Sequence, residues 1–471
     1  MVSYRMLING QLVDSPQTLD VLNPATEAVL ATVPDCSMDQ LDAAVAAARR
    51  AQPAWAAQGI EARRLLLREM IRRIEPRVAQ LSELLTQEQG KPLTMAAGEL
   101  KSMLRFMKGL SEQTLPESVN EDSAVRRSVT RRIPLGVVAA LSPWNFPALL
   151  SWWKVVPALL TGNTVVLKPS PMTPLTVLSI AEWMVDLFPP GVLNVIVGGD
   201  ALGPRLTSHP GIDKVSFTGS TETGRRVMAA GASTLKRLTL ELGGNDAAIV
   251  LPDVDLAKAV PQLFWSAFAN SGQVCVATKR LYVHRDIYQA FAQAFVAYAA
   301  TIKVGPGLDA STQLGPVQNK PQYLRVRALI EHSRQAGHPI LFEGDIPEGP
   351  GYFVPVTVFD NPPDDSRVVA EEAFGPVLPL LSFDTVDEAI RRANASSYGL
   401  AGSVWTRNLN EAIDIAQRLE TGNVYINESF YLSPNAPFAG HKQSGFGVEM
   451  GEDGLLSFTQ PQTLMIRQDL F

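Results

Sequence analysis

The sequence predicts an α/β protein built around a doubly wound parallel sheet, and three observations support this fold class. From Gly136 onward, short runs rich in β-branched residues alternate with segments of helical periodicity. The run Gly136–Leu141 is apolar throughout, as expected for a strand that helices cover on both faces. Hydrophobic residues make up 46% of the 471 residues and charged residues 19%, which is ordinary for a globular chain with a large core. Such a length corresponds to about three units of ~100–200 residues each.

The first part of the chain predicts a hairpin followed by helices. Asn9-Gly10 separates two short apolar runs, which is typical of a two-residue hairpin turn. Ser37 and Gln40 have the spacing of a capping box, so an Ala-rich helix is expected to begin there. Apolar residues then recur at helical spacing, and they predict a second helix over about Glu61 to Gly90.

Strands and helices alternate through the rest of the chain. In such βαβ arrangements the loops that follow the strands gather at one edge of the sheet, where ligands bind. The strands expected in the first sheet are Gly136–Leu141, Thr164–Leu167, Leu193–Val197, Lys214–Phe217 and Leu238–Leu240. Beyond Gly244 a second α/β region is expected, with strands near Ala247–Leu251, Arg280–Val283 and Val377–Phe383 and helices at Ile287–Thr301 and Leu324–Ala336. Outlying strands are expected around Val125–Ile133 and Leu464–Ile466.

Charge and histidine content argue against several classes of function. The net charge of −6 gives no general attraction to nucleic acid or to anionic lipid, so neither is expected as a partner. The four arginines between Arg126 and Arg132 alternate as on a strand, and they predict a charged exposed strand in preference to a polyanion site. The five histidines do not have the spacing of metal ligands, so no metal site is expected.

The expected location is the cytoplasm. The two cysteines, Cys36 and Cys275, cannot make a disulfide framework, and such low cysteine use fits a reducing compartment. The N-terminal residues contain no apolar run long enough for a signal peptide. The most apolar region, Pro147–Leu160, contains Lys154 and is too short to span a bilayer, so no membrane partner is expected.

Cys275 is the candidate nucleophile. It ends the segment Phe268–Cys275, in which small and amide side chains precede the thiol. A free thiol has a pKa near ~8.5, so only a small fraction is thiolate at neutral pH unless the site helps. A lone cysteine is usually buried and inert, and Cys36 is interpreted in that way.

Two further polar residues follow predicted strands. Glu241 comes after an apolar run and before Gly243-Gly244, a pair that permits a sharp turn. It is either a surface carboxylate or, in an apolar cleft, a general base with a raised pKa. Asn145 lies in Pro143–Pro147, where it either makes a turn or donates its amide to a reacting oxygen.

The segments around Cys275, Glu241 and Asn145 resemble the active-site signatures of the NAD(P)-dependent aldehyde dehydrogenase superfamily, and the resemblance covers nearly the whole chain. It implies that Cys275 attacks the carbonyl carbon of an aldehyde. The Asn145 amide and the Cys275 backbone N–H would donate to the oxyanion, and one such donor is worth about 3–4 kcal/mol of transition-state stabilisation. Glu241 would activate the water that hydrolyses the thioester to the carboxylic acid.

The resemblance also implies a nicotinamide dinucleotide as cofactor. Phe217–Gly224 reads as a strand, a glycine turn and a helix start, which alone is a weak signal for a pyrophosphate site. Lys168 would bond the adenosine ribose, and Glu372 and Phe374 would hold the nicotinamide end. The implied cofactor residues are Trp144, Lys168, Gly219, Ser220, Glu372 and Phe374. Pro171 stands where NAD-selective relatives often carry a glutamate, so NAD is expected and NADP is possible.

The residues implied for the aldehyde tunnel are apolar and aromatic. They favour aliphatic or aromatic aldehydes, and no arginine is evident for a carboxylated substrate. An aromatic box of Trp153 and Tyr431 for a cationic aldehyde is the alternative. The implied substrate residues are Phe146, Leu150, Trp153, Val274, Tyr431, Leu432 and Phe438.

The resemblance implies a Rossmann-like cofactor domain of residues 1–116 and 135–243 and a second α/β catalytic domain of residues 244–443. A small β oligomerisation arm of residues 117–134 and 455–471 would complete a homodimer or homotetramer. Two other functions remain open. A coenzyme A-acylating dehydrogenase would share the steps up to the thioester, but such enzymes generally do not need Glu241. A non-enzymatic structural or binding protein would not need Cys275, Glu241, Asn145 and Lys168 together.

Overall fold

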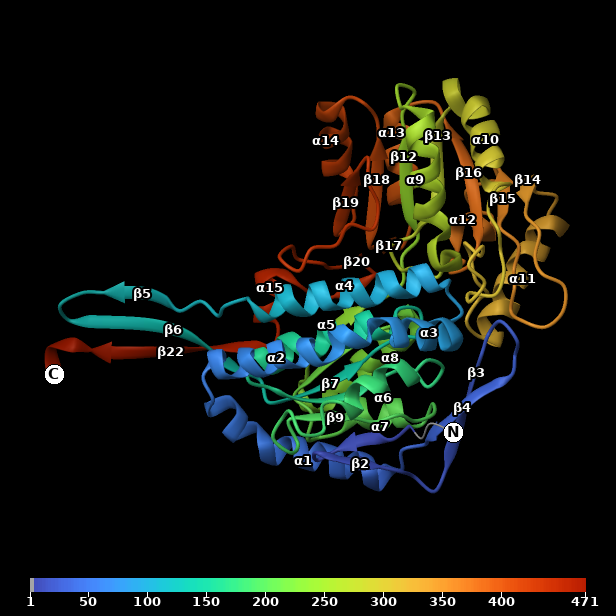
Figure 1. Ribbon diagram of the computed structural model, residues 1–471. Coiled ribbons are helices and arrows are strands. Elements are labelled where there is room, and N and C mark those ends of the chain that lie inside the picture. Colours follow the sequence, from blue (N-terminus) through green and yellow to red (C-terminus); the bar gives the residue numbers. More distant parts are fainter. Residues whose placement is uncertain (1–3) are drawn as a thin grey trace.

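The computed structural model describes residues 4–471, and it contains two large sheets and a protruding arm (Figure 1). Helices lie on both faces of each large sheet, and the arm extends sideways from the unit that contains the first sheet. The predicted fold class is therefore confirmed: two α/β units with an antiparallel β arm.

The first sheet has five parallel strands at its centre, in the order β9-β8-β7-β10-β11. The chain moves outward from β7 in one direction through β8 and β9, and then returns to the other side of β7 with β10 and β11. This order is that of a doubly wound sheet, and its crevice lies between β7 and β10. The eight strands are β1 (Met6–Ile8), β2 (Gln11–Val13), β7 (Val137–Leu141), β8 (Thr164–Lys168), β9 (Leu193–Val195), β10 (Lys214–Thr218), β11 (Arg237–Glu241) and β21 (Gly445–Phe446).

The predicted hairpin and capping box are both present. Asn9 and Gly10 have φ of 53° and 75°, so the turn between β1 and β2 uses the left-handed conformations that a tight hairpin requires. Ser37 accepts a hydrogen bond from the Gln40 N–H, and the Gln40 side chain accepts one from the Ser37 N–H, at the start of α1 (Met38–Ala57).

The single helix predicted over Glu61 to Gly90 is wrong. The structure has α2 (Ile60–Ile74), a 3₁₀ turn at Glu75–Arg77 and α3 (Val78–Gln89). The break falls at Pro76, which has no N–H to donate and whose ring clashes with the carbonyl four residues earlier. The other helices of this unit are α4 (Leu93–Ser111), α5 (Pro147–Leu160), α6 (Leu175–Glu182), α7 (Leu202–Ser208), α8 (Thr221–Gly231) and α15 (Gly451–Leu456).

The second sheet carries the predicted strands of the second α/β region and lies above the first in Figure 1. Its order is β14-β15-β16-β13-β12-β18-β19, and all neighbours except β14 and β15 are parallel. The strands are β12 (Asp246–Val250), β13 (Thr278–His284), β14 (Ile340–Glu343), β15 (Thr357–Asp360), β16 (Val377–Phe383), β18 (Ala401–Trp405) and β19 (Asn423–Ile426). The helices are α9 (Leu256–Phe268), α10 (Arg285–Ala299), α11 (Lys320–Gln335), α12 (Arg367–Ala370), α13 (Val386–Asn394) and α14 (Leu409–Arg418).

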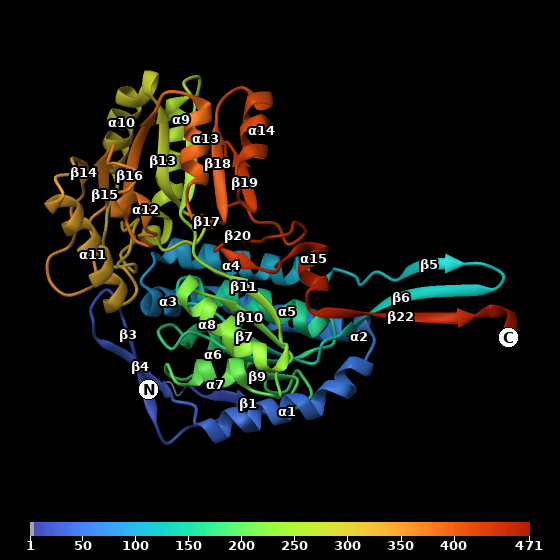
Figure 2. The same cartoon turned by 180° about the vertical axis from the view of Figure 1, so that it is seen from behind.

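The arm is an antiparallel sheet of β5 (Ser118–Asp122), β6 (Arg126–Pro134) and β22 (Thr459–Arg467), with β6 in the middle. Figure 2 shows it projecting away from the rest of the molecule, with the C-terminus near its far end. The basic cluster lies on β6, where Arg131 donates to the Gln462 side chain across the sheet. Leu464, Met465 and Ile466 are exposed on β22. Two smaller two-stranded sheets pair β3 (Thr18–Leu22) with β4 (Val29–Pro34) and β17 (Tyr398–Gly399) with β20 (His441–Lys442).

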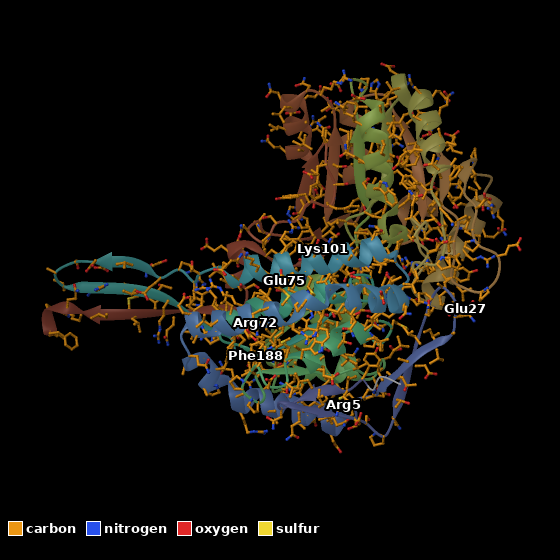
Figure 3. The ribbon with its side chains drawn as sticks, in the orientation of Figure 1. Arg5, Glu27, Arg72, Glu75, Lys101 and Phe188 are labelled. Carbon is orange, nitrogen blue, oxygen red and sulfur yellow. The ribbon has the colours of Figure 1, made fainter. Side chains whose placement is uncertain are left out.

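Charged side chains cover the outside of the molecule, for example Arg72 on α2 and Lys101 on α4 (Figure 3). Every residue of the apolar helix α5 is buried within the protein, Lys154 included. Among residues 4–471, no helix has both the length and the apolar character needed to cross a membrane.

Candidate active site

The site lies at the carboxyl edge of the first sheet, as the topology predicts. The register aligns Leu141 of β7 with Lys168 of β8, and Thr218 of β10 with Glu241 of β11. The loops that follow these strands carry Asn145, Gly219, Ser220 and Gly243, and they face loops of the second unit. Residues far apart in the sequence are thus brought together because parallel strands end at a common edge.

Two cavities meet at Cys275 and Asn145, because both residues line both cavities. The first cavity has a volume of about 160 Å³ and lies between the sheet edge and the segment around Glu372 and Phe374. The second, of about 330 Å³, lies between α4, α5 and the loops that contain Val274 and Leu432. A molecule in either cavity therefore has access to the same sulfur atom.

The loop that presents Cys275 has an unusual backbone. Asn270, Ser271 and Gly272 all have positive φ, of 51°, 56° and 73°. A Cβ at Gly272 would lie 2.1 Å from the Gly375 carbonyl oxygen, so this position requires glycine both for its conformation and for space. Non-glycine residues in the left-handed region are strained and persist only where the surroundings hold them. Here the Gln273 side chain holds the loop, donating to the Asn270 carbonyl at 2.8 Å and accepting from the Gln318 N–H at 2.9 Å.

Cys275 is half-buried at the junction of the two cavities. Burial raises the pKa of its thiol to about 12; the Lys279 ammonium opposes this shift, and Asp246 leads the nearby carboxylates that reinforce it. The Lys279 Nζ donates to the Cys275 carbonyl oxygen at 2.7 Å and thereby fixes the backbone on the far side of the residue. In this structure the thiol is therefore neutral at physiological pH, and it must lose its proton before it can act as a nucleophile.

Asn145 is held so that its amide stands beside the nucleophile loop. Its Nδ2 donates to the Gln273 carbonyl oxygen at 2.9 Å. The backbone carbonyl oxygen of Asn145 accepts from the Lys91 Nζ at 2.9 Å and from the Asn270 Nδ2 at 3.0 Å. Among the described residues, no group accepts a hydrogen bond from the Cys275 backbone N–H. The Asn145 amide and this N–H are therefore two donors at the point where the cavities meet.

Glu241 ends β11 and is buried, with 3% of its surface exposed. Within residues 4–471, neither of its carboxyl oxygens has a hydrogen-bond partner. Burial raises the pKa of this carboxyl well above its ordinary value; the charge of Glu449 raises it further and Lys154 lowers it. Lys154 forms an ion pair with Glu449 and donates to the Ser216 Oγ at 3.3 Å. An unpaired carboxyl with a raised pKa is suited to accept a proton near neutral pH.

Neither Gly243 nor Gly244 has a positive φ, so the left-handed conformation that glycine permits is not used at this pair. These positions are instead places of close approach. A Cβ at Gly243 would lie 2.2 Å from the Glu372 Oε2, and a Cβ at Gly244 would lie 2.9 Å from the Cys275 carbonyl oxygen. The pair lets Glu372 and the nucleophile loop pack directly on the backbone, and the Gly244 N–H donates to the Glu372 carboxylate at 3.1 Å.

The structure brings five of the six predicted cofactor residues together around the smaller cavity: Trp144, Gly219, Ser220, Glu372 and Phe374. The Trp144 and Phe374 rings pack edge to face with centroids 5.4 Å apart, and Phe374 has a φ of 47°. Ser220 caps α8 by accepting from the Thr223 N–H at 3.3 Å. Lys168 does not line this cavity, although it lies at the same sheet edge; burial lowers the pKa of its amine to about 8.

Six of the seven predicted substrate residues line the larger cavity: Phe146, Leu150, Trp153, Val274, Leu432 and Phe438. Tyr431 is the exception: the residue is 58% exposed and does not line this cavity. Its neighbours Phe430 and Leu432 line the cavity. The aromatic box of Trp153 and Tyr431 is therefore not formed.

One face of α4 also lines the larger cavity, and sequence reasoning missed it. Met95, Ser102, Arg105 and Phe106 recur at helical spacing on this face. The Phe106 ring packs against Trp153 with centroids 6.0 Å apart. The exposed Arg105 donates to the Leu432 carbonyl at 3.2 Å, so the cavity does contain an arginine, contrary to the sequence-based expectation.

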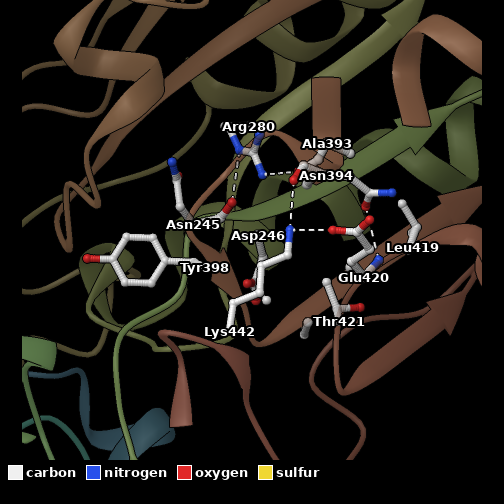
Figure 4. A pocket seen from close by; sticks show the side chains of 14 residues that line it. Asn245, Asp246, Arg280, Ala393, Asn394, Tyr398, Leu419, Glu420, Thr421 and Lys442 are labelled. Carbon is white, nitrogen blue, oxygen red and sulfur yellow. Dashed lines mark hydrogen bonds and ion pairs between the residues drawn. The ribbon is translucent and has the colours of Figure 1, made fainter. Parts of the chain in front are cut away.

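Figure 4 shows a different pocket, which has space for about 10 Å³ and hence for one water molecule. Two cationic side chains within it are paired, whereas the Asp246 Oδ2 has no hydrogen-bond partner among the described residues. Lys442 pairs with Glu420 at 2.7 Å, and Arg280 donates to the carbonyls of Asn245 and Ala393 at 2.9 Å each. A space of this size is too small for an aldehyde or a nicotinamide ring, so this pocket is not part of the active site. Within residues 4–471, no cluster of His, Cys, Asp and Glu could hold a metal ion.

Comparisons with known proteins agree with this geometry. Residues 12–464 match the aldehyde dehydrogenase family. The aldehyde dehydrogenase LUC3 of Fusarium sp is 41% identical over 98% of this chain and 99% of its own length. The phenylacetaldehyde dehydrogenase of Pseudomonas fluorescens is 40% identical over 98% of this chain and 96% of its own.

Solved structures superpose on nearly the whole chain. The betaine aldehyde dehydrogenase of Staphylococcus aureus in complex with NAD+ has a TM-score of 0.96 at 33% identity, covering 99% of this chain and 96% of that one. An NADP-dependent enzyme of E. coli has a TM-score of 0.96 at 36% identity, covering 99% and 98%. The chain therefore belongs to the aldehyde dehydrogenase family and is an NAD(P)-dependent enzyme that oxidises aldehydes to carboxylic acids.

Proposed function

We propose that the two cavities are the nicotinamide and aldehyde subsites of one active site, with Cys275 as the nucleophile between them. The observation that carries this proposal is that Cys275 and Asn145 line both cavities. An aldehyde in the larger cavity and a nicotinamide ring in the smaller one would both be adjacent to the sulfur.

The residues act in sequence. The Cys275 thiol gives its proton to water and the sulfur adds to the carbonyl carbon, while Asn145 and the Cys275 N–H donate to the resulting oxyanion. Bound NAD(P)+ supplies the acceptor for the hydride that leaves this carbon, and a thioester on Cys275 remains. Glu241 then takes a proton from water, the hydroxide adds to the thioester, and the acid departs with regeneration of the thiol.

The residues around the smaller cavity fit a dinucleotide. The start of α8, next to Gly219 and Ser220, offers backbone N–H groups for a pyrophosphate. The Glu372 carboxylate is suited to accept hydrogen bonds from ribose hydroxyls, and Trp144 and Phe374 offer an apolar surface for a ring. Lys168 would bond the adenosine ribose at the edge of the sheet. NAD is the proposed cofactor, with NADP as an alternative, in line with the two cofactors of the solved relatives.

The lining of the larger cavity supports apolar aliphatic or aromatic aldehydes as substrates. Trp153 lies between Phe106 and Phe438, with ring centroids 6.0 and 6.2 Å away, so three aromatic side chains surround the deep part of the cavity. Such a surface favours a phenyl or alkyl group. The similarity to a phenylacetaldehyde dehydrogenase supports the same class.

We propose the domain division given by the sequence: residues 1–116 and 135–243 for the cofactor, 244–443 for catalysis, and 117–134 with 455–471 for oligomerisation. The exposed apolar side chains of β22 support a role of the arm in a homodimer or homotetramer. The cytoplasmic location stays a prediction, supported by the two cysteines, both of which are free thiols.

A panel of aldehydes tests the function. Phenylacetaldehyde and medium-chain alkanals should be oxidised with kcat/KM at least about 10-fold above glycolaldehyde or succinic semialdehyde, because burying apolar groups is worth ~1–3 kcal/mol. The measurement is the absorbance of the reduced cofactor, with the acid identified by mass spectrometry. Coenzyme A serves as the control, since acyl-CoA in place of the acid would identify an acylating enzyme. An absence of cofactor reduction with every aldehyde would contradict an enzymatic role.

A substitution at Pro171 tests the cofactor assignment. Pro171→Glu should lower kcat/KM for NADP relative to NAD by about 10-fold or more, because a carboxylate near the ribose repels a 2′-phosphate and accepts from both ribose hydroxyls. Pro171→Gln is the control, since it has nearly the same shape and no charge. Equal changes for both cofactors in the two variants would show that this loop does not contact the ribose.

A further inference from the structure

A buried ion pair contacts the backbone of Asn145. The Lys91 Nζ and the Glu99 Oε2 are 2.5 Å apart, and both side chains have 0% exposure. Removing two charges from water costs several kcal/mol for each ion, and apolar residues of similar volume are often as stable. The stability of the fold alone therefore does not explain why this pair is present.

Lys91 contacts Asn145, which lines both cavities, and Phe146, which lines the larger one. Its Nζ donates to the Asn145 carbonyl oxygen at 2.9 Å and lies 3.9 Å from the centre of the Phe146 ring. Lys91 follows Gly90, which has a φ of 95° and packs so closely on Pro24 and Pro316 that a Cβ would lie 2.8 Å from each. The close packing of Gly90 thus fixes the loop that positions the Lys91 ammonium.

Glu99 holds the next residues of the same segment. Its Oε1 accepts hydrogen bonds from the N–H groups of Ala148 at 3.0 Å and Leu149 at 3.2 Å. These are the first free N–H groups of α5, whose own cap residue, Phe146, provides no side-chain acceptor. A carboxylate of α4 therefore caps α5 from outside, where the helix dipole also favours a negative charge.

We propose that the Lys91–Glu99 pair positions Asn145 for catalysis. Lys91 fixes the backbone carbonyl of Asn145, and Glu99 fixes the start of α5 a few residues later. The backbone that carries the Asn145 side chain is therefore held at two points. The side chain itself makes one hydrogen bond, to the Gln273 carbonyl, and that bond alone does not set the direction of its amide. Lys91 and Glu99 also line the aldehyde cavity themselves, next to Phe146. This inference rests on the proposed role of Asn145 as an oxyanion donor.

A double-mutant cycle tests the proposal in the full-length enzyme with phenylacetaldehyde and NAD+. Lys91→Met should slow the pre-steady-state formation of NADH by about 10–100-fold, a part of the 10²–10³ that one oxyanion donor is worth. The dissociation constant of NAD+ should stay within about twofold, because Lys91 does not line the cofactor cavity. In an Asn145→Ala background, the same substitution should change the rate by less than about threefold, since the group it positions is gone.

Arg63→Met is the matched control. Arg63 is a buried cation that holds the other end of α5 by donating to the Leu160 carbonyl at 2.8 Å, and it touches neither cavity. Its replacement should change the rate by the same factor with and without Asn145. If Lys91→Met does not fold, the variant Lys91→Met/Glu99→Gln takes its place, because it removes both charges and retains an oxygen to cap α5.

Two results separate the possible failures. If Lys91→Met slows NADH formation by the same factor in the wild-type and the Asn145→Ala backgrounds, the positioning role is overturned and the proposed function stays intact. A wild-type rate for Asn145→Ala itself would instead remove Asn145 from the oxyanion site.

Discussion

Replacing Cys275 with alanine should lower aldehyde oxidation by at least about 10⁴-fold, because no other group can form the thioester. The fold should be retained, since the side chain is small and half-buried. The measurement is NADH formation at saturating aldehyde. Cys36→Ala is the control: Cys36 is buried, 5% exposed, lines neither cavity and should leave the rate within about twofold of wild type. Turnover by Cys275→Ala above ~1% of wild type would exclude the thioester route.

The pKa of Cys275 gives this prediction a pH dependence. Burial raises the pKa of the thiol to about 12, so below that pH the protonated form dominates in the free enzyme. The thiolate is the reactive form, and its fraction rises about tenfold for each pH unit up to the pKa. Alkylation of the free enzyme by iodoacetamide should therefore accelerate from neutral pH up to at least about pH 9 without a plateau. A plateau near neutrality would show that the site supplies a stable thiolate without any ligand.

Periodic patterns explain why most of the fold could be predicted from the sequence. The strands from Val137 to Glu241 are short apolar runs between helices, and each lies within a few residues of its predicted place. Pro76 was visible in the sequence, but the apolar spacing continues across it, so the break between α2 and α3 was missed. Local chemistry at one residue can interrupt a pattern that its neighbours continue.

The residues proposed for catalysis could be named from the sequence because they occur in recognisable motifs, whereas the residues that support them could not. The Lys91–Glu99 and Lys154–Glu449 pairs depend on how α4, α5 and the C-terminal region pack, which no local spacing reveals. The one available signal was a lysine inside the apolar helix α5, which requires a buried partner. Tyr431 lies in an irregular segment, where no periodicity indicates which side chains face inward.

Replacing Glu241 with glutamine should separate the two halves of the reaction. The first turnover should still produce about one NADH per active site, because thioester formation does not require water. The steady-state rate should then fall by about 10²–10⁴-fold, which is the usual contribution of a general base. The measurement is a stopped-flow burst followed by mass spectrometry of the acylated protein. Glu75→Gln, at an exposed carboxylate on the outer surface (Figure 3), is the control and should leave both phases unchanged. Equal steady-state rates for Glu241→Gln and wild type would exclude Glu241 as the base.

The same substitution should make the protein more stable. Burial raises the pKa of Glu241 well above its ordinary value, and both oxygens lack protein partners among residues 4–471. At a pH between the ordinary and the raised pKa of Glu241, this carboxyl is protonated in the folded protein and ionised in the unfolded chain. The free energy of unfolding therefore falls as pH rises through this window. Glutamine does not titrate, so the Glu241→Gln variant does not lose this stability. The Tm of Glu241→Gln should exceed that of wild type by a margin that grows between about pH 5 and pH 8. A margin that shrinks with pH would mean that the folded site stabilises the ionised carboxylate. Slower deacylation together with a higher Tm would show that the buried Glu241 carboxyl, which serves as the base, is retained at a cost in stability.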